Sequence, residues 1–223
     1  MPRSSTPRSA RKPAPDRRRE IADAALRVIA AQGAAHFTSL AIAREVGVSD
    51  AALFRHFPTK DAIAAAAIDR MEELLFEGFP PEAADPVARL GAFFRQRVAV
   101  IRANPAIARV FASDDVGLVG DGAGAARLEA FRRRSTAFVR GCLVEASLAG
   151  ALSPAAAIEE TQVLVLGALL ALAHSPGAAS RPPELVERVW RTLETFMRRP
   201  DGRAPAAERR PPRAPRTRRT GER

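Results

Sequence analysis

Residues 38–60, TSLAIAREVGVSDAALFRHFPTK, constrain the fold more than any other part of the chain. Thr38 and Ser39 are side chains that commonly cap the first turn of a helix, and a short amphipathic stretch follows them. Gly47 supplies the positive φ that a tight turn needs, and Ser49 can then cap a second short helix. This order is typical of a helix-turn-helix, in which one face packs inward and the other lies in a DNA groove. The segment therefore predicts a DNA-binding head.

Two flanking helices are expected, of which the first completes this head and the second leads from it into the body. Before the segment, apolar residues recur at helical spacing from Ile21 onward, and Gly33 is the expected stop. After it, Thr59 is placed to cap a long helix over about residues 60–77. The residues of the helix-turn-helix that we expect to face inward are Leu40, Ile42, Ala43, Val46, Leu53 and Phe57.

The rest of the pattern predicts a helical body. Asp85-Pro86 and Asn104-Pro105 punctuate it, and the acidic, glycine-rich stretch 113–124 is expected to be a loop. With 47% hydrophobic residues, abundant Ala and no alternating β-branched runs, the composition favours an all-α protein. We expect an N-terminal three-helix head and a C-terminal body of about six helices, the last three over 125–148, 154–174 and 183–199.

The net charge of +10 is concentrated at the two ends of the chain. Residues 1–19 carry a balance of +6 and residues 200–223 a balance of +5, whereas residues 20–199 sum to −1. Both ends are rich in Pro and Arg and bury too little apolar surface to fold; whether they are only solvated or contact a polyanion stays open. The expected organisation is a disordered basic arm over 1–16, a helix-turn-helix domain over 17–63, a helical ligand-binding and dimerisation domain over 64–199, and a disordered Arg/Pro-rich tail over 200–223.

Residues 17–63 resemble the DNA-binding domain of the TetR family (TetR/AcrR type) of bacterial regulators. The matching elements are the basic approach to the first helix, Thr38-Ser39, GVS at 47–49 and LFRHFPTKDAI at 53–63. The resemblance implies a homodimer that binds a palindromic operator in double-stranded DNA and usually leaves it when a small molecule enters the body. The DNA-binding residues that it implies are Thr38, Ser39, Ser49, Asp50, Ala51, Phe54, Arg55, His56 and Lys60, with Thr38 also expected as a helix cap.

Two positions depart from the family pattern. Phe54 stands where the family usually has a Tyr that bonds a phosphate, so that one hydrogen bond is lost. Asp50 stands where a basic or small residue is common. A carboxylate near phosphates is costly unless it accepts from a cytosine amino group or pairs with Arg55, so we expect Asp50 to contribute specificity rather than affinity.

The body is expected to hold both a dimer interface and an effector pocket. The stretch VLVLGALLALA, residues 163–173, is apolar on nearly every side, which favours a partner chain over one face. The expected homodimer interface is the helix pair over about 154–174 and 183–199. The candidate pocket residues are Phe93, Phe94, Phe111, Phe131, Phe138, Cys142 and His174. The unknown effector is expected to be small and apolar or amphipathic; the alternative is a DNA-bound structural or division-type regulator whose body binds protein.

Several other classes of protein are disfavoured. The three His residues are scattered, and no GxSxG, phosphate-loop or HExxH pattern occurs, so we expect neither an enzyme nor a bound cofactor or metal. The single Cys142 excludes an intramolecular disulfide. The most apolar run is far shorter than the ~20 residues that span a bilayer, and no signal peptide is recognisable, so no membrane association and a cytoplasmic location are expected. The run Arg132–Arg134 is expected to be a solvated helix face.

Overall fold

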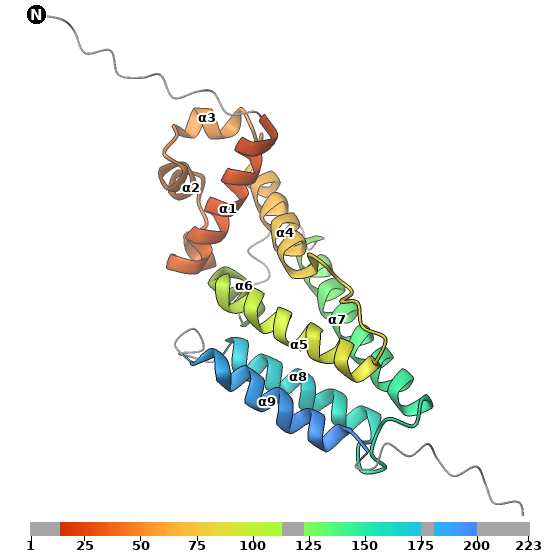
Figure 1. Cartoon of the computed structure of the whole chain (residues 1–223). Helices are drawn as coiled ribbons and strands as arrows, with labels where there is room; N and C mark the ends of the chain where they lie inside the picture. Colours follow the sequence, from red (N-terminus) through yellow and green to blue (C-terminus); the bar gives the residue numbers. More distant parts are fainter. Residues whose placement is uncertain (1–13, 113–122, 175–180, 200–223) are drawn as a thin grey trace, which may run out of the picture.

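The computed structural model describes residues 14–112, 123–174 and 181–199, and within these ranges the chain is helical with no β-strand (Figure 1). In the described residues the elements are α1 (Ala14–Gln32), a 3-10 turn (Ala34–His36), α2 (Ser39–Val46), α3 (Asp50–Phe54), α4 (Lys60–Phe76), α5 (Pro86–Ala103), α6 (Pro105–Ala112), α7 (Ala123–Leu148), α8 (Ile158–His174) and α9 (Pro183–Met197). The predicted all-α fold, with a three-helix head and a helical body of about six helices, is confirmed. No helix of the described residues has both the length and the apolar character that a membrane span requires.

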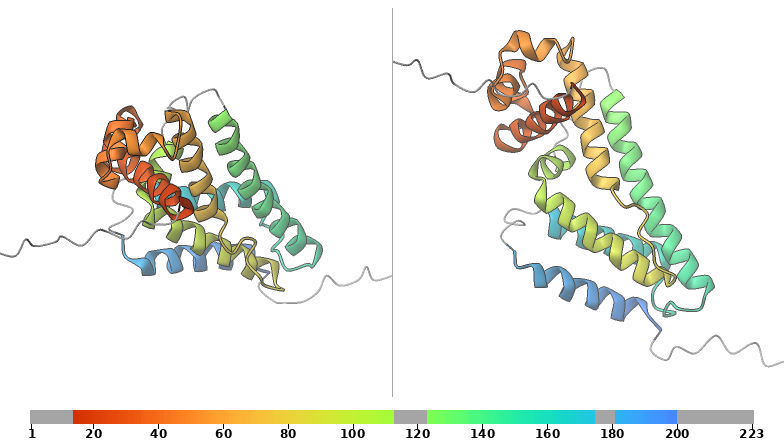
Figure 2. Two further views of the ribbon diagram at one scale, coloured as in Figure 1. Left: turned by 90° about the horizontal axis from the view of Figure 1, so that it is seen from above. Right: turned by 45° about the horizontal axis from the view of Figure 1, so that its top comes forward.

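The head and the last helix lie at opposite ends of the molecule. Figures 1 and 2 show α1, α2 and α3 at one end, α9 at the other, and α7 running past α4 and α5 between them. Helix α4 packs against α1 on one side and against α7 and α5 on the other, while α5 contacts both α8 and α9. Helix α4 is therefore a continuous connection between the head and the body.

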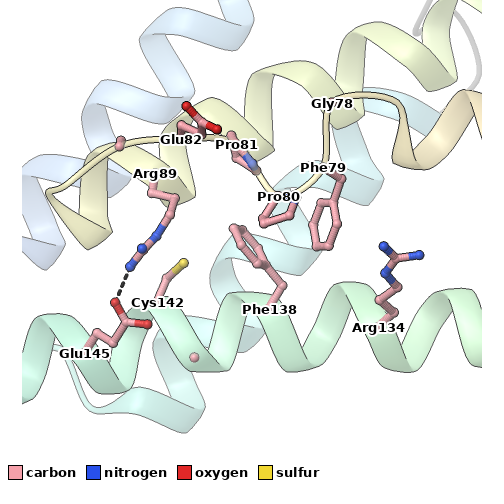
Figure 3. Close-up of a pocket in the computed structure, with 12 residues that line it drawn as sticks. Gly78, Phe79, Pro80, Pro81, Glu82, Arg89, Arg134, Phe138, Cys142 and Glu145 are labelled. Carbon is pink, nitrogen blue, oxygen red and sulfur yellow. Dashed lines mark hydrogen bonds and ion pairs between the residues drawn. The ribbon is translucent and has the colours of Figure 1, made fainter.

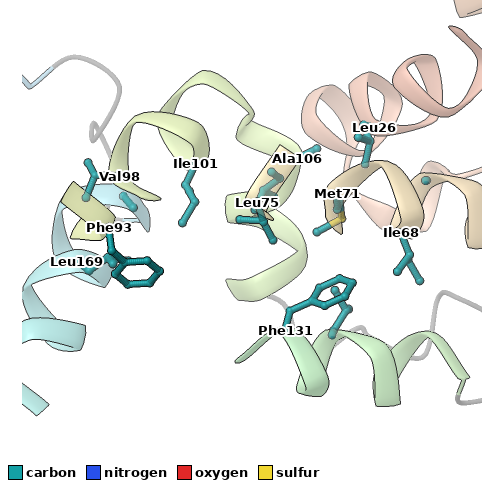
Figure 4. Close-up of a cluster of buried hydrophobic side chains, with 14 of the residues drawn as sticks. Leu26, Ile68, Met71, Leu75, Phe93, Val98, Ile101, Ala106, Phe131 and Leu169 are labelled. Atoms are coloured by element: carbon teal, nitrogen blue, oxygen red, sulfur yellow. The ribbon is translucent and has the colours of Figure 1, made fainter. Parts of the chain in front are cut away.

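One hydrophobic cluster runs from the head into the body. In the head, Ile21, Ile42, Leu53, Phe57 and Ile63 are fully buried. Figure 4 shows how the cluster continues through α4 into α5, α6, α7 and α8, with the labelled side chains Leu26, Ile68, Met71, Leu75, Phe93, Val98, Ile101, Ala106, Phe131 and Leu169. Burial of this apolar surface is the main force that holds head and body together.

Leu40 was predicted to face inward, and this is wrong: 52% of the residue is exposed. The inward face of α2 is set by Ile42 and Ala43, which are 0% and 1% exposed. Each residue of a helix is rotated by about 100° from the last, so Leu40 lies about 200° around the axis from Ile42. The helical period, rather than hydrophobicity, decides its place.

Two helix starts differ from those predicted. Helix α1 begins at Ala14, so residues 14–16, predicted to belong to a disordered arm, are helical. Helix α8 begins at Ile158 rather than near residue 154. The cause is tertiary: the Ser153 N–H donates to the Met197 carbonyl at 2.8 Å and the Arg199 N–H donates to the Ala151 carbonyl at 3.0 Å, which pairs this segment with the end of α9. Residues 1–13, the predicted loop at 113–122 and the tail from 200 lie outside the described residues.

The close approach between α5 and α9 is made possible by Gly91. A Cβ at this position would stand 2.6 Å from a ring carbon of Trp190, which is 1% exposed and tilted against Phe94 at 5.4 Å between ring centroids. A rigid indole ring held by neighbours cannot move aside cheaply. Gly91 is therefore required by packing.

We predict that Gly91→Ala lowers the free energy of unfolding by about 1–3 kcal/mol, the usual cost of overpacking a core. The matched control is Gly141→Ala in α7, where a Cβ would meet nothing within 4 Å. Because Ala is the better helix former, the control should be neutral or stabilising by up to about 1 kcal/mol. Urea denaturation of both variants measures the difference, and equal effects would contradict the proposed steric role.

Candidate functional site

Three hydroxyl side chains frame the helix-turn-helix. Thr38, Ser49 and Thr59 each accept a backbone N–H, from Ala41, Ala52 and Ala62 respectively, at 3.1 Å. Gly47 closes α2 with φ +74°, where its N–H reaches the carbonyls of the last turn. All three predicted caps and the turn glycine are confirmed, and together they fix the starts of α2, α3 and α4 at one end of the molecule (Figure 1).

The residues predicted to contact DNA lie at this end, mostly exposed. Beneath them Leu53 and Phe57 are fully buried, and they hold α3 and the turn after it in place. Phe54 is 38% exposed, an unusual position for a phenyl ring, and Leu40 adds a second exposed apolar side chain that the prediction missed. The solvent-facing members of the predicted set are Thr38, Ser49, Asp50, Ala51, Phe54, Arg55 and Lys60, while Ser39 and His56 are half-buried.

The three arginines in the first turns of α1 contact other residues of the protein. The Arg18 guanidinium donates to the His56 carbonyl at 2.8 Å and lies over the Phe57 ring at 4.3 Å from its centroid. Arg17 pairs with Glu20 at 2.8 Å, and Arg19 approaches Glu73 at 3.6 Å. Arg18 therefore ties α1 to the turn between α3 and α4, a structural role that the sequence pattern does not reveal.

Ion pairs along α4 connect the head to the body. Arg70, whose side chain is 16% exposed, donates to Asp23 of α1 at 2.7 Å and to Glu73 at 2.8 Å. On the other side of α4, Asp69 accepts from Arg127 of α7. Burial opposes the effect, but these carboxylates raise the pKa of Arg70 above its ordinary value. Helix α4 is thus fastened to both neighbours by charge as well as by apolar packing.

A cavity of about 320 Å³ lies in the body, with walls from α4, α5, α6, α7 and α8. Four of the predicted pocket residues line it: Phe93, Phe111, Phe131 and His174. The remaining lining residues, which the prediction missed, are Leu75, Arg97, Ile101, Arg132, Ser135, Thr136, Leu166, Leu169 and Leu170. The cavity is therefore mostly apolar with a few polar groups, as small-molecule sites usually are.

Arg97 is the unusual member of this wall. The residue is 6% exposed, and its guanidinium lies 4.8 Å from the Phe76 ring centroid and 5.1 Å from that of Phe93. Its Nη2 has no hydrogen-bond partner, and within the described residues it forms no ion pair. Burial, with repulsion from Arg134, lowers the pKa of Arg97 to about 10, which leaves it charged at neutral pH.

The other basic groups of the wall are differently placed. His174 has its Nδ1 3.4 Å from the Ala108 carbonyl oxygen, and burial lowers the pKa of this imidazole despite that contact, which favours its neutral form. Arg132 lies over the Phe111 ring at 5.3 Å and approaches Glu129 at 3.7 Å. The run Arg132–Arg134 is exposed, as predicted, and Arg132 has these contacts in addition.

The remaining candidate pocket residues lie elsewhere. Phe138 and Cys142 line a second hollow of about 960 Å³ between α7 and the segment after α4, where Figure 3 shows the Arg89–Glu145 ion pair beside Cys142. Burial raises the pKa of the Cys142 thiol, which favours the uncharged form of a packed side chain. Phe94 is fully buried against Trp190 and lines neither hollow. The seven candidates therefore do not form one site.

A sequence signal for Arg97 exists, although the prediction did not use it. Phe93, Arg97 and Ile101 are four residues apart and so share one face of α5. A cation in the middle of an apolar helix face is either paired within the fold or reserved for something else. Only the structure shows that no carboxylate of the described residues reaches it.

The outer surface of α8 and α9 carries exposed apolar side chains. Val163, Leu164 and Leu170 of α8 are 69%, 48% and 53% exposed, and Phe196 of α9 is 42% exposed. A Cβ at Gly167 would meet nothing within 4 Å. Helices α8 and α9 lie at the end of the molecule opposite α2 and α3 (Figure 1).

Comparison with known sequences identifies the head. Residues 21–67 match the profile of the family described as bacterial regulatory proteins, tetR family. Among curated proteins, the nucleoid occlusion factor SlmA of Marinomonas sp. (strain MWYL1) is 32% identical over 102 residues, which cover 44% of this chain and 52% of SlmA. The chain spans about half the length of the curated relatives it matches.

Solved structures with the same fold cover most of the chain. PfmR, a TetR family transcriptional regulator from Thermus thermophilus, has a TM-score of 0.66 at 19% identity, over 85% of this chain and 100% of PfmR. AibR, solved in complex with isovaleryl coenzyme A and operator DNA, has a TM-score of 0.64 at 19% identity, over 81% of this chain and 97% of AibR. At these identities the likeness shows the fold.

We predict that Arg18→Ala lowers the free energy of unfolding by about 1 kcal/mol, because a hydrogen bond and a cation–π contact are lost together. Arg19→Ala is the matched control, since its side chain is 63% exposed in an ion pair of 3.6 Å. Such pairs contribute from about zero to 1 kcal/mol. Thermal denaturation of both variants measures this. A larger loss of stability for Arg19→Ala would show that Arg18 does not hold α1 against the turn between α3 and α4.

Proposed function

Since this chain belongs to the TetR family of bacterial regulatory proteins, we propose that it is a dimeric transcription repressor released from its operator by a small effector. The observation that carries the proposal is the course of α4, which begins beside the helix-turn-helix at Lys60 and ends in the cavity wall near Leu75. Within one helix, a surface suited to DNA and a space suited to a ligand are connected.

The proposed DNA contacts follow from exposure and position. Ser39, His56 and Lys60 are assigned to phosphates, the last at the start of α4, where the backbone N–H groups also favour an anion. The exposed residues 49–51 at the start of α3 are assigned to base edges in the major groove. Phe54 and Arg55 flank them, and Thr38 acts mainly as the cap of α2.

The proposed dimer forms through α8 and α9. Their exposed apolar side chains, Val163, Leu164, Leu170 and Phe196, would be covered by the same surface of a second copy, as a two-fold interface requires. Two heads must then stand roughly 34–36 Å apart, or a multiple of that turn, to enter successive major grooves. This requirement makes the spacing of the heads the property that an effector can control.

Release is proposed to follow from what the cavity touches. Its wall includes Leu75 of α4, which carries the head, and Phe111 of α6, a helix that packs against α1. A ligand that fits only one arrangement of these helices shifts the equilibrium between head spacings by its differential affinity for the two states. AibR, of the same fold, was solved with both an acyl-coenzyme A and operator DNA, which supports a ligand-responsive reading.

A second candidate function is a DNA-bound structural or division-type regulator, favoured by the similarity to the nucleoid occlusion factor SlmA. On that reading the body binds a protein rather than a metabolite. A cavity of about 320 Å³ supports the first function, because a body that only serves as a docking surface has no need of an interior space.

The test of DNA recognition is selection of a binding site from random duplexes by the full chain, followed by salt titration. A palindromic site is expected. Lys60→Gln should weaken binding to every sequence alike and lower the slope of log K against log salt by about one. Arg133→Gln, which removes an exposed cation of α7 in the body, is the control and should leave the slope unchanged.

Asp50 tests sequence readout separately from affinity. We predict that Asp50→Ala changes the ranking of operator variants by about 1–3 kcal/mol at one base pair, because a carboxylate can accept from a cytosine amino group. Competition binding with single-base-pair variants of the selected site measures the ranking. An unchanged ranking would show that Asp50 reads no base.

The dimer interface is tested at Gly167, where a side chain meets nothing in the same chain. Gly167→Glu should dissociate the dimer, because it places a charge within an apolar interface. Ala168 is a less clean site, since it packs against the core. Analytical ultracentrifugation measures the change, with Ala137→Glu on the exposed side of α7 as control. A Gly167→Glu protein that stays dimeric would place the interface elsewhere.

A further inference from the structure

We propose that the effector is a carboxylic acid with an apolar tail and that Arg97 binds its carboxylate inside the cavity. The proposal rests on the proposed function, which it sharpens by naming the chemical class of the effector. It starts from an arginine that is 94% buried, by its 6% exposure, in the wall of an otherwise apolar space. A buried charge of this kind destabilises the folded protein unless an anion pairs with it.

Arg97 stands apart among the buried polar groups that lack a partner. In the described part of the chain these are Arg97 Nη2, Thr161 Oγ1 and Gln162 Oε1. Only the first carries a charge, and only the first belongs to a residue that lines the cavity. A neutral hydroxyl or amide left unpaired costs about 1–3 kcal/mol, whereas a charge costs more. The observation therefore points to the arginine as the group that a ligand satisfies.

Arg70 shows how the same fold treats a structural arginine. Its side chain is 16% exposed, and two carboxylates, those of Asp23 and Glu73, pair with it within 2.8 Å. Arg97 is more deeply buried, and none of the described residues offers it such a carboxylate; the charged group that affects it is the like charge of Arg134. The fold thus pairs the arginine that holds α1 to α4 and leaves the arginine of the cavity unpaired.

The charges around the cavity select a monoanion. In the described part of the chain, its lining residues include Arg97 and Arg132 and no Asp or Glu. Arg132 already has Glu129 at 3.7 Å and lies on the Phe111 ring, so it needs no second counter-ion. Burial lowers the pKa of His174, which favours the neutral imidazole. One uncompensated positive charge therefore faces the space, and a single carboxylate matches it.

The geometry of the guanidinium suits a carboxylate. Its position against the rings of Phe76 and Phe93 restricts the orientation of its planar group. A held guanidinium can present two N–H groups to the two oxygens of a carboxylate in parallel hydrogen bonds. Beyond it, Phe111, Phe131 and Leu169 offer an apolar surface for a tail. A volume of about 320 Å³ lies at the small end of ligand pockets, roughly 300–1,000 Å³, which favours a medium-length acyl or aryl tail.

The test uses matched acids and alcohols on the full chain. Octanoate is compared with 1-octanol, and 4-phenylbutyrate with 4-phenyl-1-butanol, by isothermal titration calorimetry at pH 7. The two members of a pair share a tail and differ in charge. At least one acid is expected to bind about tenfold or more tightly than its alcohol, since a hydrogen bond to a charged group contributes about 1.5–3 kcal/mol. Equal binding of acid and alcohol in both pairs overturns the proposal.

A second experiment removes Arg97 and compares the result with a variant that loses the same charge elsewhere. Arg97→Gln should lose the preference for the acid while retaining binding of the alcohol, because the apolar wall is untouched. Arg133→Gln removes an exposed positive charge on α7 without touching the cavity, and it should keep the preference. An Arg97→Gln protein that still favours the acid about tenfold would show that another cation binds it.

Stability without a ligand separates a binding role from a structural one. Arg97→Met keeps most of the side-chain volume and removes the buried charge, so the ligand-free variant should unfold at the same temperature as the parent or a higher one. A midpoint lowered by several degrees would show that Arg97 serves the fold, and would overturn the proposal. Far-UV circular dichroism confirms that each variant is folded before binding is compared.

Release of DNA distinguishes the failure of this inference from the failure of the proposed function. With the selected operator duplex, an acid that binds through Arg97 should release wild-type protein but not Arg97→Gln. Release by the alcohols alone would overturn the acid assignment and leave the regulator intact. Binding of the acid without release would support the site and count against the ligand-responsive function.

Discussion

The fold depends on α4 being shared by two units that could otherwise move independently. One face buries Ile63 and Ala67 with α1, and the far end buries Leu75 among the residues of the body. Helix α4 has 17 residues, and at about 1.5 Å each it spans roughly 25 Å between the cavity wall and the end of the head that carries the helix-turn-helix. The Arg70–Asp23 pair adds a directional contact to this apolar packing. Head and body are therefore one mechanical unit, although a sequence divides them at about residue 63.

Local rules predict the head well because its structure is locally determined. Thr38, Ser49 and Thr59 satisfy N–H groups only three residues away, and Gly47 is defined by its own φ, so a window of a few residues holds all the information. The start of α8 fails for the opposite reason. The Ser153 hydroxyl accepts the Ala155 N–H at 3.3 Å, as a cap would, but residues 154–155 form only a turn. The Ser153 N–H pairs with the Met197 carbonyl, 44 residues later in the chain, and a local pattern cannot reveal such a contact.

The lining of the cavity could not be predicted from the sequence for a related reason. Aromatic residues on one helix face predict that something apolar is near, but not which of them share a space. Phe93 and Phe94 are neighbours in sequence, yet one lines the cavity and the other packs on Trp190 through the opening that Gly91 leaves. Arg97 is informative only through the absence of a carboxylate near it among the described residues. An unpaired charge is a property of the packed molecule.

The low net charge of the head limits how strongly it can attract DNA, and so limits the free energy that release from DNA would require. Residues 20–62 hold four basic and five acidic residues, and Arg18 is committed to the His56 carbonyl and the Phe57 ring. Few phosphates can then be neutralised by the folded head, so its affinity for DNA rests on a small number of placed donors. Each 1.4 kcal/mol of coupling changes that affinity about tenfold. Under the proposed function, a single buried ion pair between Arg97 and a ligand, formed in only one arrangement of α4 and α6, would supply the differential free energy that releases the operator.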